Sequence, residues 1–144
     1  MKMRPMRRAR WMAAYRRAEY CVLLANGELI LRVGRRNAAA DGRLRREAGV
    51  RNHWAVVTPC NPGSRQLEWT TNAARLEAFE IALVDGGIRT WPSINRDPIH
   101  SWPAEAGFLI CDPEPGFAES IGRLFDQHAI LVGELGVAPS LSWL

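Results

Sequence analysis

The segment with the clearest chemical potential is the loop 59–64, Pro-Cys-Asn-Pro-Gly-Ser, which follows an apolar run and precedes a helical pattern. A loop in this position exposes backbone N–H groups, and the start of the following helix favours anions. Asn61 and Ser64 can hydrogen-bond a ligand there. Alternatively, Asn61 sets the turn and Ser64 caps the helix, because serine is a preferred N-cap residue.

Two polar side chains on the following helical pattern can join this loop. Asn72 and Arg75 are about one turn apart and therefore share a helix face. Arg75 can bind a carboxylate or phosphate with two parallel hydrogen bonds, or it can lie on a solvated face beside acidic neighbours. Asparagine is a poor residue for a helix interior, which favours a specific role for Asn72.

The segment 96–105 combines carboxylates, an imidazole and an indole. Asp97, His100 and Glu105 are residue types that act as acids or bases, and Glu105 is the candidate catalytic residue. The alternative is a surface loop anchored by Trp102, since long loops are either functional or merely mobile.

Gln127 and His128 end the last helical pattern, directly before an apolar run. Both can contact a ligand, and a histidine can carry a proton near neutral pH. The alternative for His128 is a helix C-terminal cap, because a charged imidazole interacts favourably with the helix dipole there.

The cysteines and histidines are scattered, with no close pair of metal-ligand spacing. The sequence therefore predicts no metal site, and it predicts reduced, mostly buried thiols at Cys21, Cys60 and Cys111. Glycine-rich phosphate loops are missing, so we predict no cofactor. The reduced thiols, together with the lack of a secretory pattern, favour a cytoplasmic protein.

Charge is distributed unevenly along the chain. Residues 1–51 hold 14 of the 19 Lys and Arg residues but only 4 of the 15 Asp and Glu residues. A basic first third with Trp11 and Tyr15 suits nucleic acid or an acidic protein partner. The candidate contacts are Arg4, Arg7, Arg8, Arg10, Arg16 and Arg17. Alternatively, the arm is a solubilising or self-docking segment, or the basic and acidic halves meet in a homodimer.

The 144 residues fit a single domain, which we place at 19–144 behind a basic N-terminal arm or helix, 1–18. Asn26-Gly27 predicts a type I′ hairpin within residues 19–34. No apolar run reaches the length of a membrane helix, so we expect no membrane partner. The remaining pattern predicts helices at 37–49, 66–85 and 115–127, strands at 53–58, 88–94, 107–111 and 129–133, and an irregular tail at 134–144.

From residue 53 the predicted order is strand–helix–strand–strand–helix–strand. This order is typical of the ferredoxin-like split βαβ sandwich, in which two helices cover one face of an antiparallel sheet. The predicted fold class is therefore α+β, with an added N-terminal β-hairpin and helix.

The chain resembles the bacterial domain-of-unknown-function family 3293 over about residues 15–133. The resemblance implies a small bacterial domain with polar functional positions at Asn61, Ser64, Asn72, Glu105 and Gln127. The chain has His128 where the family has asparagine, which weakens His128 as a functional residue. The segments that carry the resemblance are Glu19-Tyr20, Leu31-Arg32-Val33-Gly34, Thr58-Pro59-Cys60-Asn61-Pro62-Gly63-Ser64, Asn72, Trp102-Pro103-Ala104-Glu105 and Phe125-Asp126-Gln127-His128-Ala129-Ile130.

The polar candidates fall in loops and helix ends that can meet at one edge of the predicted sheet. The leading hypothesis is a pocket for a small polar or anionic ligand, formed by the 59–64 loop, the second helix, the 95–105 loop and residues 127–128. Convergence of these side chains in one cleft would support it. The alternative is a nucleic-acid or acidic-partner module that uses the Arg-rich N-terminal third.

Overall fold

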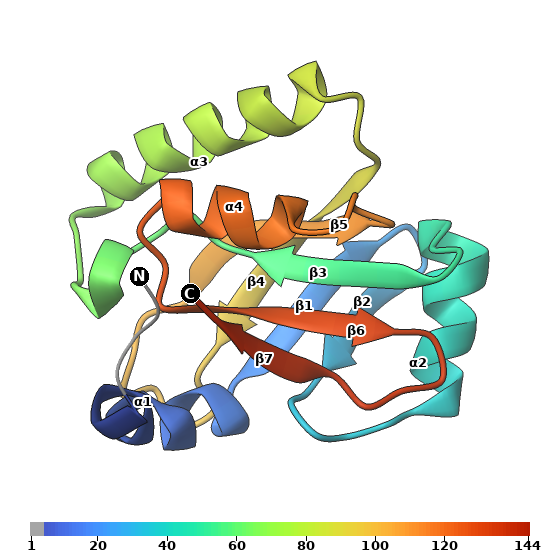
Figure 1. The fold of residues 1–144 in the computed structure, drawn as a ribbon, viewed down its shortest axis with the longest axis horizontal. Coiled ribbons are helices and arrows are strands. Elements are labelled where there is room, and N and C mark those ends of the chain that lie inside the picture. The colour runs from blue at the N-terminus through green and yellow to red at the C-terminus, as the bar shows by residue number, and fades with distance from the viewer. Residues whose placement is uncertain (1–4) are drawn as a thin grey trace.

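The computed structural model describes residues 5–144, with side chains from Arg8 onward, as an α+β fold (Figure 1). The predicted α+β class is confirmed. The helices are α1 (Pro5–Arg17), α2 (Ala38–Arg43), α3 (Trp69–Asp85) and α4 (Phe117–Leu124). The strands are β1 (Glu19–Leu24), β2 (Gly27–Leu31), β3 (His53–Val57), β4 (Thr90–Arg96), β5 (Glu105–Cys111), β6 (Ala129–Glu134) and β7 (Ser140–Trp143).

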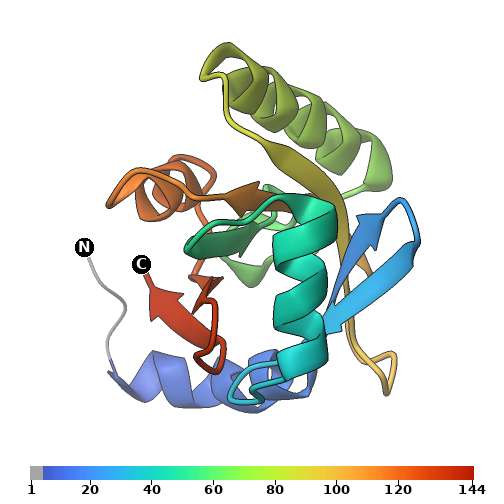
Figure 2. The same cartoon turned by 90° about the vertical axis from the view of Figure 1, so that its right-hand side faces the viewer.

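All seven strands form one antiparallel sheet in the order β2-β1-β4-β5-β3-β6-β7. The N-terminal hairpin extends the sheet because β1 pairs with β4, with Cys21 opposite Ile94. The sheet curls, as Figure 2 shows from the side. Because of this curl, the loop after edge strand β2 meets the loop before edge strand β7. The Gly34 N–H of the first loop donates to the Pro139 carbonyl of the second at 2.8 Å.

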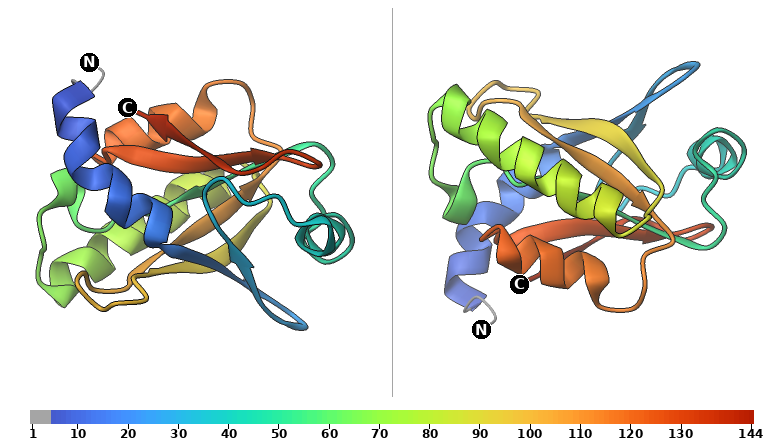
Figure 3. Two further views of the ribbon diagram at one scale, coloured as in Figure 1. Left: turned by 90° about the horizontal axis from the view of Figure 1, so that it is seen from below. Right: turned by 90° about the horizontal axis from the view of Figure 1, so that it is seen from above.

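Successive side chains of a strand point to opposite faces of the sheet. In the central strands the side chains on both faces are apolar, and both faces are therefore buried. On β3, Trp54 and Val56 pack with α2 on one face, whereas Ala55 and Val57 pack with α3 and α4 on the other. Figure 3 shows α3 and α4 lying over the same side of the sheet. The face that carries α2 is completed by the hairpin, whose Val22 is fully buried.

Local sequence explains several element ends. Asn37 caps α2 as predicted, because its side chain accepts a hydrogen bond from the Ala40 N–H at 3.1 Å. The helix continues as a π-helical turn over Leu44–Ala48 and ends at Gly49 with φ 81°. The predicted hairpin also forms, but the prediction of a type I′ turn at Asn26-Gly27 is wrong. The two turn residues are 25 and 26, and neither has a positive φ. Gly27, which does have a positive φ, follows the turn as the first residue of β2 instead of being its second residue.

The prediction of an irregular tail is wrong. Residues 140–143 form β7, which pairs with β6 and places Leu141 opposite Leu131. The open edge of β6 offers unpaired backbone groups, and pairing satisfies them. A four-residue strand directly after Pro139 gives too short an alternation to be recognised from sequence.

Helix α1 packs along one end of the sheet rather than extending from it (Figure 3). The Tyr15 and Trp143 rings meet edge to face with centroids 5.4 Å apart. At its C-terminal end, Arg17 donates to the Asp97 carboxylate at 2.9 Å. Among the residues described, no helix is both long and apolar enough to cross a membrane.

Candidate functional site

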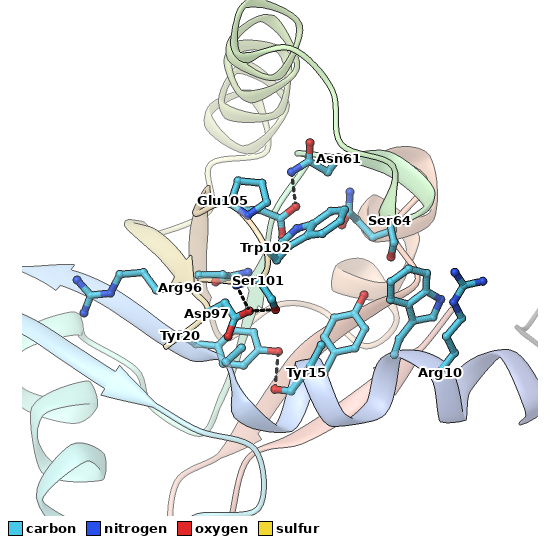
Figure 4. A pocket seen from close by; sticks show the side chains of 16 residues that line it. Arg10, Tyr15, Tyr20, Asn61, Ser64, Arg96, Asp97, Ser101, Trp102 and Glu105 are labelled. Atoms are coloured by element: carbon cyan, nitrogen blue, oxygen red, sulfur yellow. Dashed lines mark hydrogen bonds between the residues drawn. The ribbon is translucent and has the colours of Figure 1, made fainter. Parts of the chain in front are cut away.

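A pocket of about 270 Å³ opens where α1 crosses the end of the sheet (Figure 4). Its walls come from the inner face of α1, the loop after β3, the β4–β5 connection and the turn before β6. The lining residues are Arg10, Trp11, Ala14, Tyr15, Ala18, Tyr20, Asn61, Ser64, Asn95, Arg96, Asp97, Ser101, Trp102, Pro103, Glu105 and Gln127.

Asn61 is the central residue of the pocket's polar side. Its Oδ1 accepts from the Leu67 N–H at 2.9 Å and from Asn72 Nδ2 at 2.8 Å, which fixes the orientation of the amide. Its Nδ2 therefore points to Glu105 and donates to Oε2 at 2.7 Å. Asn61 is buried and left-handed, with φ 49°, a conformation that asparagine tolerates better than most residues.

Glu105 begins β5 and lies opposite Asn95 in the sheet register. Burial raises the pKa of its carboxyl, while hydrogen bonds from the side chains of Asn61 and Trp102 oppose that shift. Both of these donors are neutral. Among the described residues, Glu105 forms no ion pair. A desolvated carboxyl group held only by neutral donors is suited to exchange a proton or to accept hydrogen bonds.

The aromatic wall is built by one face of α1, where Trp11, Ala14, Tyr15 and Ala18 follow helical spacing. Burial raises the pKa of Tyr15 to about 12, and the charge of Glu105 adds to this effect. Figure 4 shows the Tyr15 hydroxyl pointing toward Ser64. The phenol therefore stays protonated at neutral pH and can donate a hydrogen bond within the pocket.

Asp97 ties the β4–β5 connection to α1. Its carboxylate accepts from Arg17 Nε at 2.9 Å and from the N–H groups of Ile99 at 3.2 Å and Ser101 at 3.0 Å. It also accepts from the Ser101 hydroxyl. These bonds, with that from Arg17 the largest cause, lower the pKa of Asp97 well below its usual range. This carboxylate therefore holds the rim of the pocket, whereas Glu105 is the proton-exchanging candidate.

Ser64 does not cap the helix that follows, since α3 begins at Trp69 with Glu68 in the N-cap position. Instead, its hydroxyl lies 2.7 Å from His128 Nδ1. The backbone of Ser64 is left-handed, with φ 56°. His128 follows the end of α4 by several residues, and its ring lies tilted beside that of Trp11, with ring centroids 5.8 Å apart. His128 is therefore not the C-terminal cap of α4, and it adjoins the pocket through Ser64 and Trp11, which line it.

Arg75 and Gln127 hold backbone segments together. Arg75 donates to the Pro59 carbonyl at 2.7 Å and to the Phe125 carbonyl at 2.6 Å, and it is absent from the pocket lining. Gln127 lines the pocket while donating to the Cys60 carbonyl at 3.0 Å. The structure thus gathers Asn61, Ser64, Glu105, Gln127 and His128, with Asn72 and Arg75 behind them.

Residues 57–130 match the family model described as "Protein of unknown function (DUF3293)". The match covers half of the chain. The protein belongs to the DUF3293 family. No curated protein and no solved structure matches the chain. The DUF3293 match contains Asn61, Ser64, Glu105 and Gln127, whereas the α1 wall of the pocket lies outside it.

The arginines of the N-terminal third have different surroundings in this DUF3293 protein. Arg8 lies over the Trp143 ring at 5.7 Å, Arg10 over Trp11 at 5.2 Å, and Arg17 binds Asp97. Arg16 is exposed. Arg4 and the side chain of Arg7 lie outside the described residues. Trp11 and Tyr15 line the pocket, and nucleic-acid binding by the arm stays a prediction.

Sequence reasoning assigned other roles to several pocket residues. Trp11 and Tyr15 are predicted as stacking groups of a basic arm, and Trp102 is predicted only as the anchor of a surface loop. The spacing of Trp11, Ala14, Tyr15 and Ala18 marks a single helix face, but it does not say which part of the chain that face covers. The contacts of α1 with distant segments supply that information.

In the described part of the chain, no three His, Cys, Asp or Glu residues are grouped to hold a metal ion. Burial raises the pKa of the Cys60 thiol, which donates to the Ala106 carbonyl at 3.5 Å. A buried thiol of this kind is chemically inert compared with a thiolate. All three cysteines are free and buried.

Proposed function

We propose that the protein binds a small polar ligand in the pocket beneath α1, with N–H or O–H donors of the ligand placed on Glu105. The observation that carries this proposal is the carboxyl group of Glu105, which is partly buried, faces the pocket and is held by neutral donors alone. A ligand that donates to this group would satisfy its remaining acceptor capacity.

The chemistry of the lining favours a planar ligand that donates hydrogen bonds. Asn95 Oδ1 is a buried acceptor with no partner among the described residues, and Asn95 lies opposite Glu105. Buried polar atoms without partners are rare and are commonly satisfied by a ligand or water. Trp11, Tyr15 and Trp102 provide flat apolar surface. An amidine-like or amino-substituted ring combines both properties.

Glu105 is also our candidate acid or base, with Asn61 as its positioning residue. Ser64, Gln127 and His128 line or adjoin the same space and would orient the ligand's other polar groups. Arg10 stands at the margin of the pocket and would attract an anionic substituent. These roles extend the family assignment, which by itself names no activity.

Benzamidine tests the ligand chemistry because it is planar and carries an amidinium group, and benzoate is its matched anionic counterpart. We expect benzamidine to shift amide resonances around the pocket saturably, with benzoate weaker. Glu105→Gln should weaken benzamidine binding about tenfold, because it replaces a charge-assisted bond by a neutral one. Glu114→Gln, an exposed carboxylate outside the pocket lining, is the matched control. Equal losses in both variants, or no saturable binding, would contradict the proposal.

We also propose that residues 53–134 form a ferredoxin-like unit within a single domain, 19–144, to which the segment 1–18 is added. Support comes from the strand order β4-β5-β3-β6, in which every neighbour pair is antiparallel. Helices α3 and α4 share one face of this sheet. In this arrangement α1 closes a pocket at the sheet end rather than contributing to the core.

A further inference from the structure

A second pocket, of about 370 Å³, shares no lining residue with the pocket beneath α1. It lies between the loop from β2 to α2 and the loop from β6 to β7. The Gly34–Pro139 backbone hydrogen bond joins these two loops. The lining residues are Ile30, Leu31, Arg32, Arg35, Arg36, Asn37, Ala40, Asp41, Trp54, Val137 and Pro139.

Trp54 lines this pocket, and its indole N–H is a buried hydrogen-bond donor. Its residue is 2% exposed, and its Nε1 has no partner among the described residues. The indole is held in place by β6, since a Cβ on Gly133 would come within 2.1 Å of the ring. A buried indole N–H normally finds an acceptor. A fixed, buried donor at the wall of a pocket favours a ligand that brings a hydrogen-bond acceptor.

The rim of the same pocket is strongly basic. Arg35 and Arg36 are exposed and have no carboxylate partner among the described residues, whereas Arg32 is paired with Glu19 at 3.1 Å. The pocket contains one carboxylate, Asp41, which accepts from the Gly136 N–H at 3.0 Å. Positive charge thus exceeds negative charge around the buried donor.

We propose that this pocket binds the phosphate group of a small molecule, with Trp54 Nε1 donating to an oxygen of the anion and Arg35 and Arg36 neutralising its charge. Guanidinium groups bind phosphate through two parallel hydrogen bonds, which makes arginine a preferred phosphate ligand. The apolar lining by Ile30 and Val137 leaves space for an organic substituent. This site is independent of the proposed ligand at Glu105.

Inorganic phosphate is the first probe, because it presents the proposed group alone. The readout is the indole N–H resonance of Trp54 in a ¹H–¹⁵N correlation spectrum, assigned by its disappearance in Trp54→Phe. We expect a saturable shift of this resonance with phosphate and none with chloride at equal ionic strength. The double variant Arg35→Gln/Arg36→Gln should weaken phosphate binding about tenfold, through the lost charge-assisted bonds.

Arg45→Gln/Arg46→Gln is the matched control, because it removes the same charge from two exposed arginines that do not line the pocket. This control should bind phosphate as the unmodified chain does. An unshifted Trp54 resonance, or equal weakening in the two double variants, overturns the proposal. The benzamidine titration at Glu105 reports on the other pocket, so either site can fail without the other.

Discussion

Replacing Asn61 by alanine tests whether one amide organises the pocket. The substitution removes three hydrogen bonds, from Leu67 N–H at 2.9 Å, from Asn72 Nδ2 at 2.8 Å and to Glu105 Oε2 at 2.7 Å. It also places alanine at φ 49°, where asparagine is better tolerated. The backbone of residue 61 keeps its bond to the Asn72 side chain.

The expected loss of stability follows from the chemistry of each bond. A neutral hydrogen bond contributes about 0.5–1.5 kcal/mol, and a bond to a charged group about 1.5–3 kcal/mol. For two neutral bonds and one to Glu105, we expect the free energy of unfolding to fall by about 3–5 kcal/mol at pH 8. At pH 4, where Glu105 is protonated, the loss should be smaller by about 1 kcal/mol, because the third bond is then neutral.

Urea denaturation at several pH values measures this difference directly. Asn52→Ala is the control, because Asn52 is exposed and none of its side-chain atoms forms a described hydrogen bond; its effect should stay within about 0.5 kcal/mol. In a Glu105→Gln background, the pH-dependent part of the Asn61→Ala effect should vanish. A loss below about 1 kcal/mol, or one that keeps its pH dependence in that background, would refute the proposed network.

Further substitutions test the parts around the network. Gly107→Ala should lower the free energy of unfolding by about 1–3 kcal/mol in urea, because its Cβ would lie 2.4 Å from the Val57 carbonyl oxygen; an unchanged midpoint would contradict this close approach. Arg75→Lys should lose about 1–2 kcal/mol, since lysine cannot bridge two carbonyls with a rigid fork; full stability in that variant would contradict the bridge. Trp143→Ala should increase hydrogen exchange in α1, as it removes an aromatic contact of that helix; unchanged exchange would show that other contacts suffice. Glu105 has a raised pKa, so its contribution to stability is complete below its ordinary value of 4.5 and is lost as the pH rises through the raised pKa; Glu105→Gln should remove this decline between pH 4 and 8, and parallel pH profiles would contradict it.

Local patterns were sufficient to predict most elements of the fold. The caps at Asn37 and Gly49 bound the helix predicted at 37–49, and a short apolar run marks β3, the strand before the 59–64 loop. Each of these patterns depends on contacts within a few residues. The hairpin turn shows the limit, because Asn-Gly is compatible with two turn types that differ by one residue in register.

The candidate site was predictable in part, for a different physical reason. Asn61, Ser64, Glu105 and Gln127 occur where strands and helices end, and such ends collect at sheet edges. Their individual roles depend on long-range partners that spacing does not encode. From sequence, Arg75 is either an anion ligand or part of a solvated helix face, yet both of its carbonyl partners come from other segments, 16 and 50 residues away.

Helix α1 links the basic N-terminal third to the candidate site. Its composition predicts a cationic arm, and its aromatic residues favour nucleic acid as a partner. Its inner face instead places Trp11 and Tyr15 in the pocket, while Arg17 anchors its C-terminal end on Asp97. The helix therefore closes the pocket whose polar side lies in the DUF3293 match. Movement of α1 would open the pocket and expose Glu105 to water, so ligand binding at Glu105 and ordering of α1 should be coupled.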